Sequence, residues 1–310
     1  MPWPREFGKL TILFFPTMTT PTMVDAPPGG VWHDLCEVVH DINHSRGLIY
    51  QLTLRDIRVR YKQAVMGFAW AILSPMLIVA AGIVVRVAML HMAGQAFELG
   101  TATAIIVKGL AWGFFAAAIG FATTSLTGNG ALITKVYFPR ETLPLSVILA
   151  STFDSLIGSA AMSLLLPFFG WRPTWAVLWV PVLAVVLFAF TLAAGLFISC
   201  ANLFFRDVRY ITQLLVTFGI FFSPVYYEPA VLGGRWIVPQ MLNPLAPILE
   251  GLRLSAVDGH NLFRTLHQAS DGAVIWSPLF LAYSVVWAFG GLVVAALIFH
   301  RAQFRFAEYV

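Results

Sequence analysis

Long runs of apolar residues constrain this chain more than any other feature of its sequence. Six such blocks come close to the roughly 20 residues that an α-helix needs to cross a bilayer. They cover residues 67–90, 103–124, 143–166, 175–200, 211–226 and 276–299. Only 11% of the residues are charged and 59% are hydrophobic, whereas a soluble domain carries about 25% charged residues. We therefore predict an all-α integral membrane protein with six transmembrane helices.

Two segments between the blocks are predicted to touch the membrane without crossing it. Residues 48–66 mix apolar and basic side chains at helical spacing, which predicts an amphipathic helix in the membrane interface; a plain basic flank of the first span is the alternative. Residues 228–273 are semi-apolar but broken by four prolines. They predict short re-entrant helices before the last span, which are allowed where protein or water satisfies the backbone.

The N-terminal part differs in composition from the remainder. Residues 16–30 are rich in Thr, Pro and Gly, as in flexible segments. We therefore divide the chain into a flexible cytoplasmic tail, residues 1–45, and a membrane domain, residues 46–310.

The distribution of Lys and Arg predicts the orientation in the membrane. Ten basic residues flank the blocks on one side: Arg55, Arg58, Arg60, Lys62, Lys135, Arg140, Arg206, Arg209, Arg301 and Arg305. Six lie on the other: Arg86, Lys108, Arg172, Arg235, Arg253 and Arg264. The richer side faces the cytoplasm, so both termini are expected there. Arg86 is expected to snorkel to the same surface at which Lys108 lies.

No residue pattern predicts catalysis, a metal site or a nucleotide site. The seven histidines and two cysteines lack metal-ligand spacing. Residues 128–135 read GNGALITK, but a phosphate-binding loop needs Gly before its Lys and Ser or Thr after it. Any use of ATP is thus expected in another chain.

Two features of the apolar blocks have both a functional and a structural interpretation. Asp154 is an acid deep inside a predicted span; it either has a charge-dependent role or forms a hydrogen bond to Ser151, Ser155 or a neighbouring helix. The fifth block is rich in aromatic residues, which suit contact with sugar rings or with lipid. These residues are Phe218, Phe221, Phe222, Tyr226 and Tyr227.

Three segments resemble motifs of the permeases of ABC-2-type polysaccharide and polyol-phosphate exporters. The first reads RDIRVRYKQ over residues 55–63, followed by GFAWA over 67–71 and Pro75. The second reads GNGALITKVYFPR over 128–140, with LPL over 143–145. The third reads RDVRY over 206–210, with SP at 223–224 and NPL at 243–245. The resemblance covers about residues 48–300, and the order of the motifs makes it specific.

The resemblance implies a homodimer of permeases that works with two separate ABC ATPase subunits. ATP and Mg²⁺ would bind to those partners, with no cofactor in this chain and no nucleic acid involved. The substrate would be a lipid-linked glycan such as O-antigen (the polysaccharide of lipopolysaccharide), teichoic acid or capsule, exported across a bacterial inner or plasma membrane. The chain would be a transporter permease and not an enzyme. An ABC-2 drug or small-lipid exporter and, in another class, a membrane-embedded glycosyl- or acyltransferase are the alternatives.

The resemblance also suggests roles for two sets of residues. The loop that contacts the ATPase would include Asn129, Lys135, Tyr137, Arg140 and Glu141. The basic residues that guide a lipid pyrophosphate at the cytoplasmic entrance would be Arg55, Arg58, Arg60 and Lys62, since Arg binds phosphate through paired donors. Binding of anionic bilayer lipid is the alternative for this second set.

Overall fold

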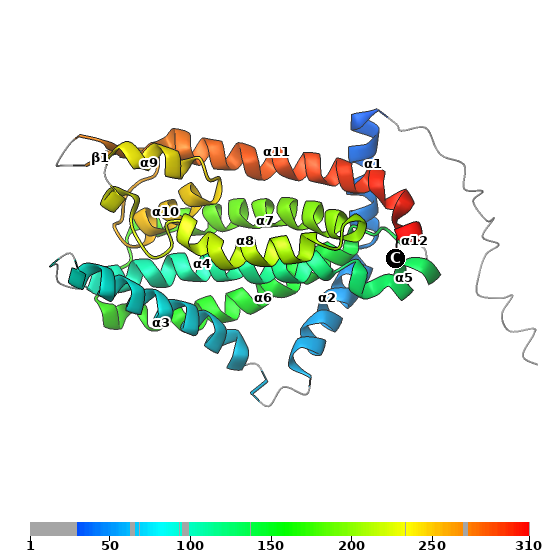
Figure 1. Ribbon diagram of the computed structural model, residues 1–310, viewed down its shortest axis with the longest axis horizontal. Coiled ribbons are helices and arrows are strands. Elements are labelled where there is room, and N and C mark those ends of the chain that lie inside the picture. Colours follow the sequence, from blue (N-terminus) through cyan, green and yellow to red (C-terminus); the bar gives the residue numbers. More distant parts are fainter. Residues whose placement is uncertain are drawn as a thin grey trace, which may run out of the picture.

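The protein is a bundle of long α-helices that lie side by side along one axis (Figure 1). The computed structural model describes residues 30–62, 66–67, 69–92, 94, 99–136, 138–232, 234–268 and 272–309. The helices of the bundle are α3 (Ala69–Met92), α4 (Leu99–Thr124), α6 (Thr142–Ser163), α7 (Trp179–Phe204), α8 (Val208–Phe222) and α11 (Pro278–Ala302). The prediction of an all-α integral membrane protein is confirmed.

Five segments among the described residues are long and apolar enough to cross a membrane. They correspond to α3, α4, α6, α11 and the combination of α7 with the preceding short helix η3 (Trp175–Leu178). The sixth predicted span matches α8, whose 15 residues extend roughly 22 Å, less than the roughly 30 Å of a bilayer core. The total of six spans therefore stays a prediction.

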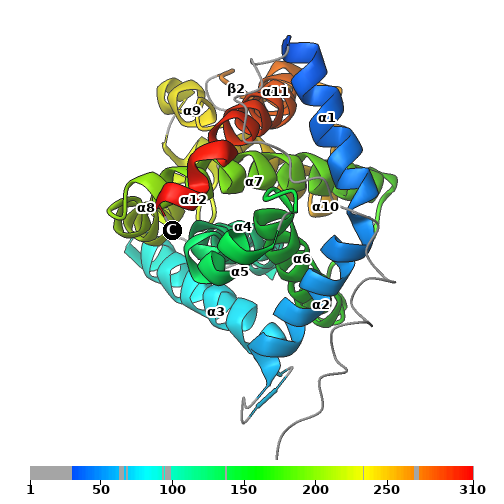
Figure 2. The ribbon, with the colours of Figure 1, turned by 90° about the vertical axis from the view of Figure 1, so that its right-hand side faces the viewer.

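Several short helices gather at one end of the bundle, which we call the α5 end (Figure 2). They are α1 (Val31–His44), α2 (Arg46–Tyr61), η1 (Thr127–Asn129), α5 (Gly130–Lys135), η5 (Gln303–Arg305) and α12 (Phe306–Tyr309). The predicted interfacial helix over 48–66 corresponds to α2. Its basic and apolar side chains do not separate into two clean faces, and α1 is the more amphipathic of the two helices.

The N-terminal tail differs from the prediction of a flexible segment up to residue 45. Residues 1–29 lie outside the described residues, but residues 31–44 form α1. This helix packs on the end of α11, where Arg301 binds the buried Asp34 at 2.9 Å. A second pair joins Nε2 of His300 to Glu37 at 3.5 Å. These contacts with the C-terminal end of α11 stabilise α1 as a helix.

The opposite end, which we call the α10 end, contains the segment predicted as re-entrant helices. Its elements are η2 (Leu166–Phe169), η4 (Pro229–Leu232), α9 (Gly234–Met241), α10 (Leu245–Ala256) and the antiparallel strands β1 (Leu266–His267) and β2 (Val274–Trp276). Every residue of α10 is buried within the protein. The short helices thus exist, while their entry into the membrane stays a prediction.

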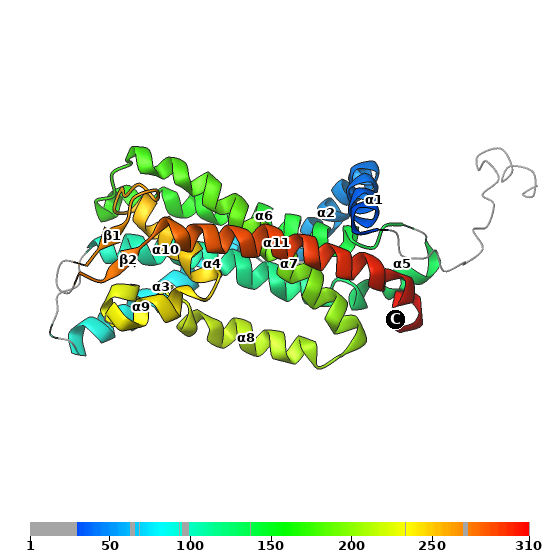
Figure 3. The ribbon, with the colours of Figure 1, turned by 90° about the horizontal axis from the view of Figure 1, so that it is seen from above.

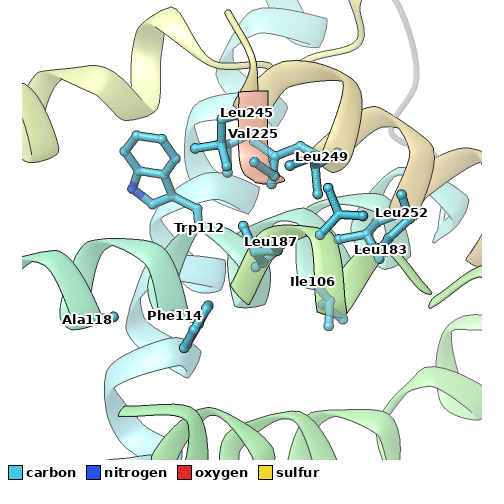
Figure 4. Packing of buried hydrophobic residues seen from close by; sticks show 14 of the residues in the cluster. Ile106, Trp112, Phe114, Ala118, Leu183, Leu187, Val225, Leu245, Leu249 and Leu252 are labelled. Atoms are coloured by element: carbon cyan, nitrogen blue, oxygen red, sulfur yellow. The ribbon is translucent and has the colours of Figure 1, made fainter. Parts of the chain in front are cut away.

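A continuous apolar core connects α10 with the long helices. Figure 4 shows Leu249 of α10 and Val225 close to Leu187 of α7 and Trp112 of α4. Close packing rather than water exclusion drives helix association in a bilayer, so small residues are needed where helices approach. Gly82 is such a position: a Cβ atom there would lie 2.5 Å from the Tyr226 ring.

Candidate functional site

Asp154 is held by α2, the helix that precedes the first span. Its Oδ2 atom accepts a hydrogen bond from Nη1 of Arg60 at 2.7 Å, and its Oδ1 atom accepts one from the Tyr61 hydroxyl, also at 2.7 Å. The second Arg60 nitrogen donates to the Ser151 hydroxyl at 3.1 Å. The guanidinium also lies 3.7 Å above the Phe121 ring, a favourable arrangement for a cation.

This contact gives the intramembrane acid a partner that sequence spacing does not reveal, because Arg60 and Asp154 are 94 positions apart. A carboxylate inside a span is normally paired, and here a basic helix supplies the pair. The same contact raises the pKa of the Tyr61 hydroxyl, first through burial and then through its hydrogen bond to the negative Asp154. The arrangement fastens α2 to the middle of α6.

Of the four basic residues proposed for the cytoplasmic entrance, two bind acidic side chains and two do not. Arg60 is engaged by Asp154, and Arg55 binds the adjacent Asp56 at 2.8 Å. Arg58 and Lys62 are exposed, and neither makes an ion pair with any residue in the described part of the chain. Arg58 lies in the last turn of α2 and Lys62 directly follows the helix. Their role in meeting an anionic ligand stays a prediction.

The residues proposed for the ATPase contact are divided in a similar way. Lys135 is exposed at the end of α5, while Asn129 donates to the Ser125 carbonyl at 2.8 Å. Arg140 donates to the backbone carbonyl of Gln303 in η5. Glu141 is buried and lies 3.4 Å from Nδ1 of His300. Tyr137 lies outside the described residues.

Arg140 and Glu141 therefore connect the turn after α5 to the C-terminal end of α11. Lys135 remains available for another chain. The exposed Lys135 therefore faces outward, whereas Arg140 and Glu141 hold the loop in position.

The aromatic residues proposed for sugar contact have different surroundings, although the rings of Phe221 and Tyr226 meet edge to face with their centroids 6.2 Å apart. Phe218, Phe221 and Phe222 are exposed on the outer face of α8. Tyr226 is buried against Gly82, and Tyr227 follows it in the connection to η4. Gln240 of α9 donates to the Tyr227 hydroxyl. Tyr226 thus belongs to the apolar core, and Tyr227 is half-buried beside it.

A buried charge network at the α10 end was not predicted from sequence. Nζ of Lys108 donates to the Tyr227 carbonyl at 2.7 Å and lies 3.8 Å from Glu250. Arg253 donates to the other Glu250 oxygen at 2.6 Å and to Asp258 at 2.7 Å. Lys108 and Glu250 are 1% and 0% exposed. The network joins α4, α10 and the connection that follows α8.

The prediction that Arg86 snorkels is wrong, since its side chain is buried within the protein, as is that of Lys108. For Lys108 the physical reason is the inward packing of α10, which brings Glu250 next to α4 and replaces the membrane surface as the environment of this charge. A usable sequence signal was the pair of charges Glu250 and Arg253, three positions apart in an otherwise apolar helix. Among the residues that the structure describes, no His, Cys, Asp and Glu side chains gather as a metal site would require.

Several apolar helices long enough to cross a bilayer, packed side by side with paired charges between them, define a multi-pass membrane protein. A model of the family described as "ABC-2 type transporter" matches residues 47–256. The chain therefore belongs to the ABC-2 type transporter family. Membrane subunits of this family work with an ATPase subunit.

Similar proteins cover nearly the same length. The O-antigen export system permease protein RfbA of Myxococcus xanthus is 25% identical over 276 residues, which are 88% of this chain and 99% of that protein. An O-antigen export system permease protein RfbA of Klebsiella pneumoniae is 27% identical over 273 residues, 87% of this chain and 97% of that protein. A second protein of that name from Klebsiella pneumoniae is 26% identical over the same length.

Proposed function

We propose that this chain is the transmembrane subunit of an ABC exporter that moves a lipid-linked polysaccharide out across the bacterial cell membrane. The single observation that carries the proposal is its similarity, along almost the whole length, to permeases named for O-antigen export. O-antigen, teichoic acid and related glycans share the features that matter here, a hydroxyl-rich chain and an anionic lipid carrier.

In this proposal two copies of the chain enclose the path and two ATPase subunits bind at the α5 end. That end would face the cytoplasm together with both termini, as the excess of Lys and Arg favours. ATP-driven closure of the ATPases would push on Lys135 and the turn after α5. Because Arg140 and Glu141 connect this turn to the end of α11, the push would move long helices as rigid bodies.

Deletion of the gene in its native host tests the proposal. The expected result is loss of the surface polysaccharide with accumulation of its lipid-linked form inside the cell. Complementation should require an ATPase that hydrolyses ATP. A change in drug resistance with normal surface polysaccharide would favour a drug or small-lipid exporter. Loss of the polysaccharide without internal accumulation would favour a glycosyl- or acyltransferase.

A further inference from the structure

A groove opens between α4 and α8 in the half of the bundle nearer the α5 end; its surface is mostly apolar, with polar side chains along it. Its volume is about 400 Å³, within the lower range of small-molecule sites. Six polar side chains line it: Thr123, Thr124, Arg209, Thr212, Gln213 and Thr217. A larger hollow of about 550 Å³ on the outer face of α3 is lined almost entirely by apolar residues and suits lipid.

The polar residues of α8 form one face of this helix. Arg209, Thr212, Gln213 and Thr217 follow the three- and four-residue spacing that places side chains on one side. The opposite face carries exposed apolar residues, among them Leu215, which is two positions from both Gln213 and Thr217. In Figure 3, α8 runs along one edge of the bundle, and Figure 2 shows it beside α4. The polar face is therefore turned towards α4, and the apolar face is turned outward.

Two of the six polar side chains of the groove bond to the protein. Thr123 and Thr124 each donate to a carbonyl of their own helix, at 2.7 and 3.5 Å. Within the described part of the chain, the side chains of Thr212, Gln213 and Thr217 make no hydrogen bond. Arg209 lies 5.1 Å from the Tyr210 ring and has no carboxylate partner among the described residues. Unpaired polar groups are costly in a bilayer, so this groove needs water or a polar ligand.

The chemistry of the groove selects a class of ligand. Threonine hydroxyls and an amide both donate and accept hydrogen bonds, as sugar hydroxyls do. No acid lines the groove, so it would not repel an anion, and a guanidinium near its α5 end can bind phosphate or carboxylate through paired donors.

We propose that the α4–α8 groove binds sugar units of the exported glycan, with Arg209 holding an anionic group at the end nearer α5. The inference rests on the proposed export function and assigns the glycan to the polar face of α8. Phe218 and Phe222 lie on its other face and would contact lipid or the second copy, while Phe221, four positions after Thr217, borders the groove.

Photo-crosslinking in the native host tests this assignment in the intact complex. A photo-reactive amino acid replaces Thr217 in one variant and Leu215, an exposed residue on the apolar face, in the matched control. The expected adduct at position 217 stains for carbohydrate and disappears in cells that do not synthesise the glycan. Position 215 should give adducts with lipid or protein only. Adducts at position 217 with only lipid or a second permease would overturn the proposal, as would equal glycan adducts at both positions.

Export by groove variants gives an independent measurement. We expect the double variant Gln213→Leu/Thr217→Val to export glycan about tenfold more slowly, the effect of losing roughly two hydrogen bonds. The amount of complex in the membrane should not change, and Leu215→Val, on the opposite side of α8, should behave as the unchanged protein. Unaltered export by the double variant, in a host whose deletion strain lacks surface glycan, rejects the groove and leaves the export function standing. Surface glycan that persists in the deletion strain rejects both.

Discussion

The Asp154 carboxylate accepts hydrogen bonds from two residues of α2, so its removal should release the end of that helix. In Asp154→Ala, the half-buried Arg60 guanidinium loses its carboxylate partner and keeps only the neutral acceptors Ser151 and the Val147 carbonyl. We expect a loss of about 3 kcal/mol in unfolding free energy, typical of breaking one side of a buried pair, measured by thermal unfolding in detergent. Arg60→Leu/Asp154→Leu removes both charges and should be more stable than either Leu single variant. Additive losses would contradict a direct pairing.

The Tyr61 hydroxyl adds a dependence on pH to the same contact. Its pKa is raised because burial and Asp154 both disfavour the phenolate, so the folded protein holds this proton more tightly than the unfolded chain. The stabilisation is complete below the ordinary tyrosine pKa of about 10 and is lost as the pH rises through the higher folded value. At neutral pH, Tyr61→Phe should be less stable than the unchanged protein by about 1 kcal/mol. Above about pH 10, the stability of this variant should fall less steeply with pH than that of the unchanged protein. Equal alkaline slopes in chemical unfolding would refute the assignment.

The turn after α5 separates a residue that faces outward from residues that hold the turn in place. Lys135→Glu reverses an exposed charge, and we expect ATP-driven export to fall about tenfold, the scale of one lost charge pair at an interface, while thermal stability stays the same. Arg140→Glu removes the bond to the Gln303 carbonyl and should lower both stability and export. Purified permease and ATPase in vesicles provide both readouts. Full export by Lys135→Glu would exclude it from the ATPase contact.

Individual helices differ in how far the sequence predicts them. The apolar blocks identify α3, α4, α6, α7 and α11 because each has the length and composition that a bilayer requires. α1 was missed because its order depends on Arg301 and His300, which are more than 250 positions away. α8 was predicted in part. Its aromatic residues were apparent in the sequence, but the groove along its polar side chains is formed only by its packing against α4.

The arrangement of the two ends explains why candidate residues were easier to find than their partners. At the α5 end, basic residues flank the spans and are visible in the sequence as an excess of Lys and Arg. At the α10 end, a short helix folds inward and brings Glu250 to Lys108, 142 positions away. Charge patterns identify membrane surfaces, but pairing inside the bundle depends on tertiary packing. The α4–α8 groove has the same origin, since its two walls come from helices far apart in the chain.

Lys108 joins three parts of the molecule, and its replacement should therefore loosen the whole α10 end. In Lys108→Met, the Tyr227 carbonyl loses its donor and the fully buried Glu250 loses one of its two cations. We expect a loss of about 3–5 kcal/mol, measured as a lower unfolding temperature and less folded protein in the membrane. Lys135→Met, at an exposed lysine, is the matched control and should change stability by less than about 0.5 kcal/mol.

A second variant separates the charge network from simple packing of the Lys108 side chain. Lys108→Met/Glu250→Gln removes one charge of each sign and leaves Arg253 bound to Asp258 at 2.7 Å. Since the cost of Lys108→Met comes mainly from an uncompensated buried charge, the double variant should recover part of the lost stability. Thermal unfolding of the four proteins (parent, two single variants and the double variant) gives the coupling free energy. A double variant no more stable than Lys108→Met would mean that the lysine stem, rather than its charge, holds this end of the bundle together.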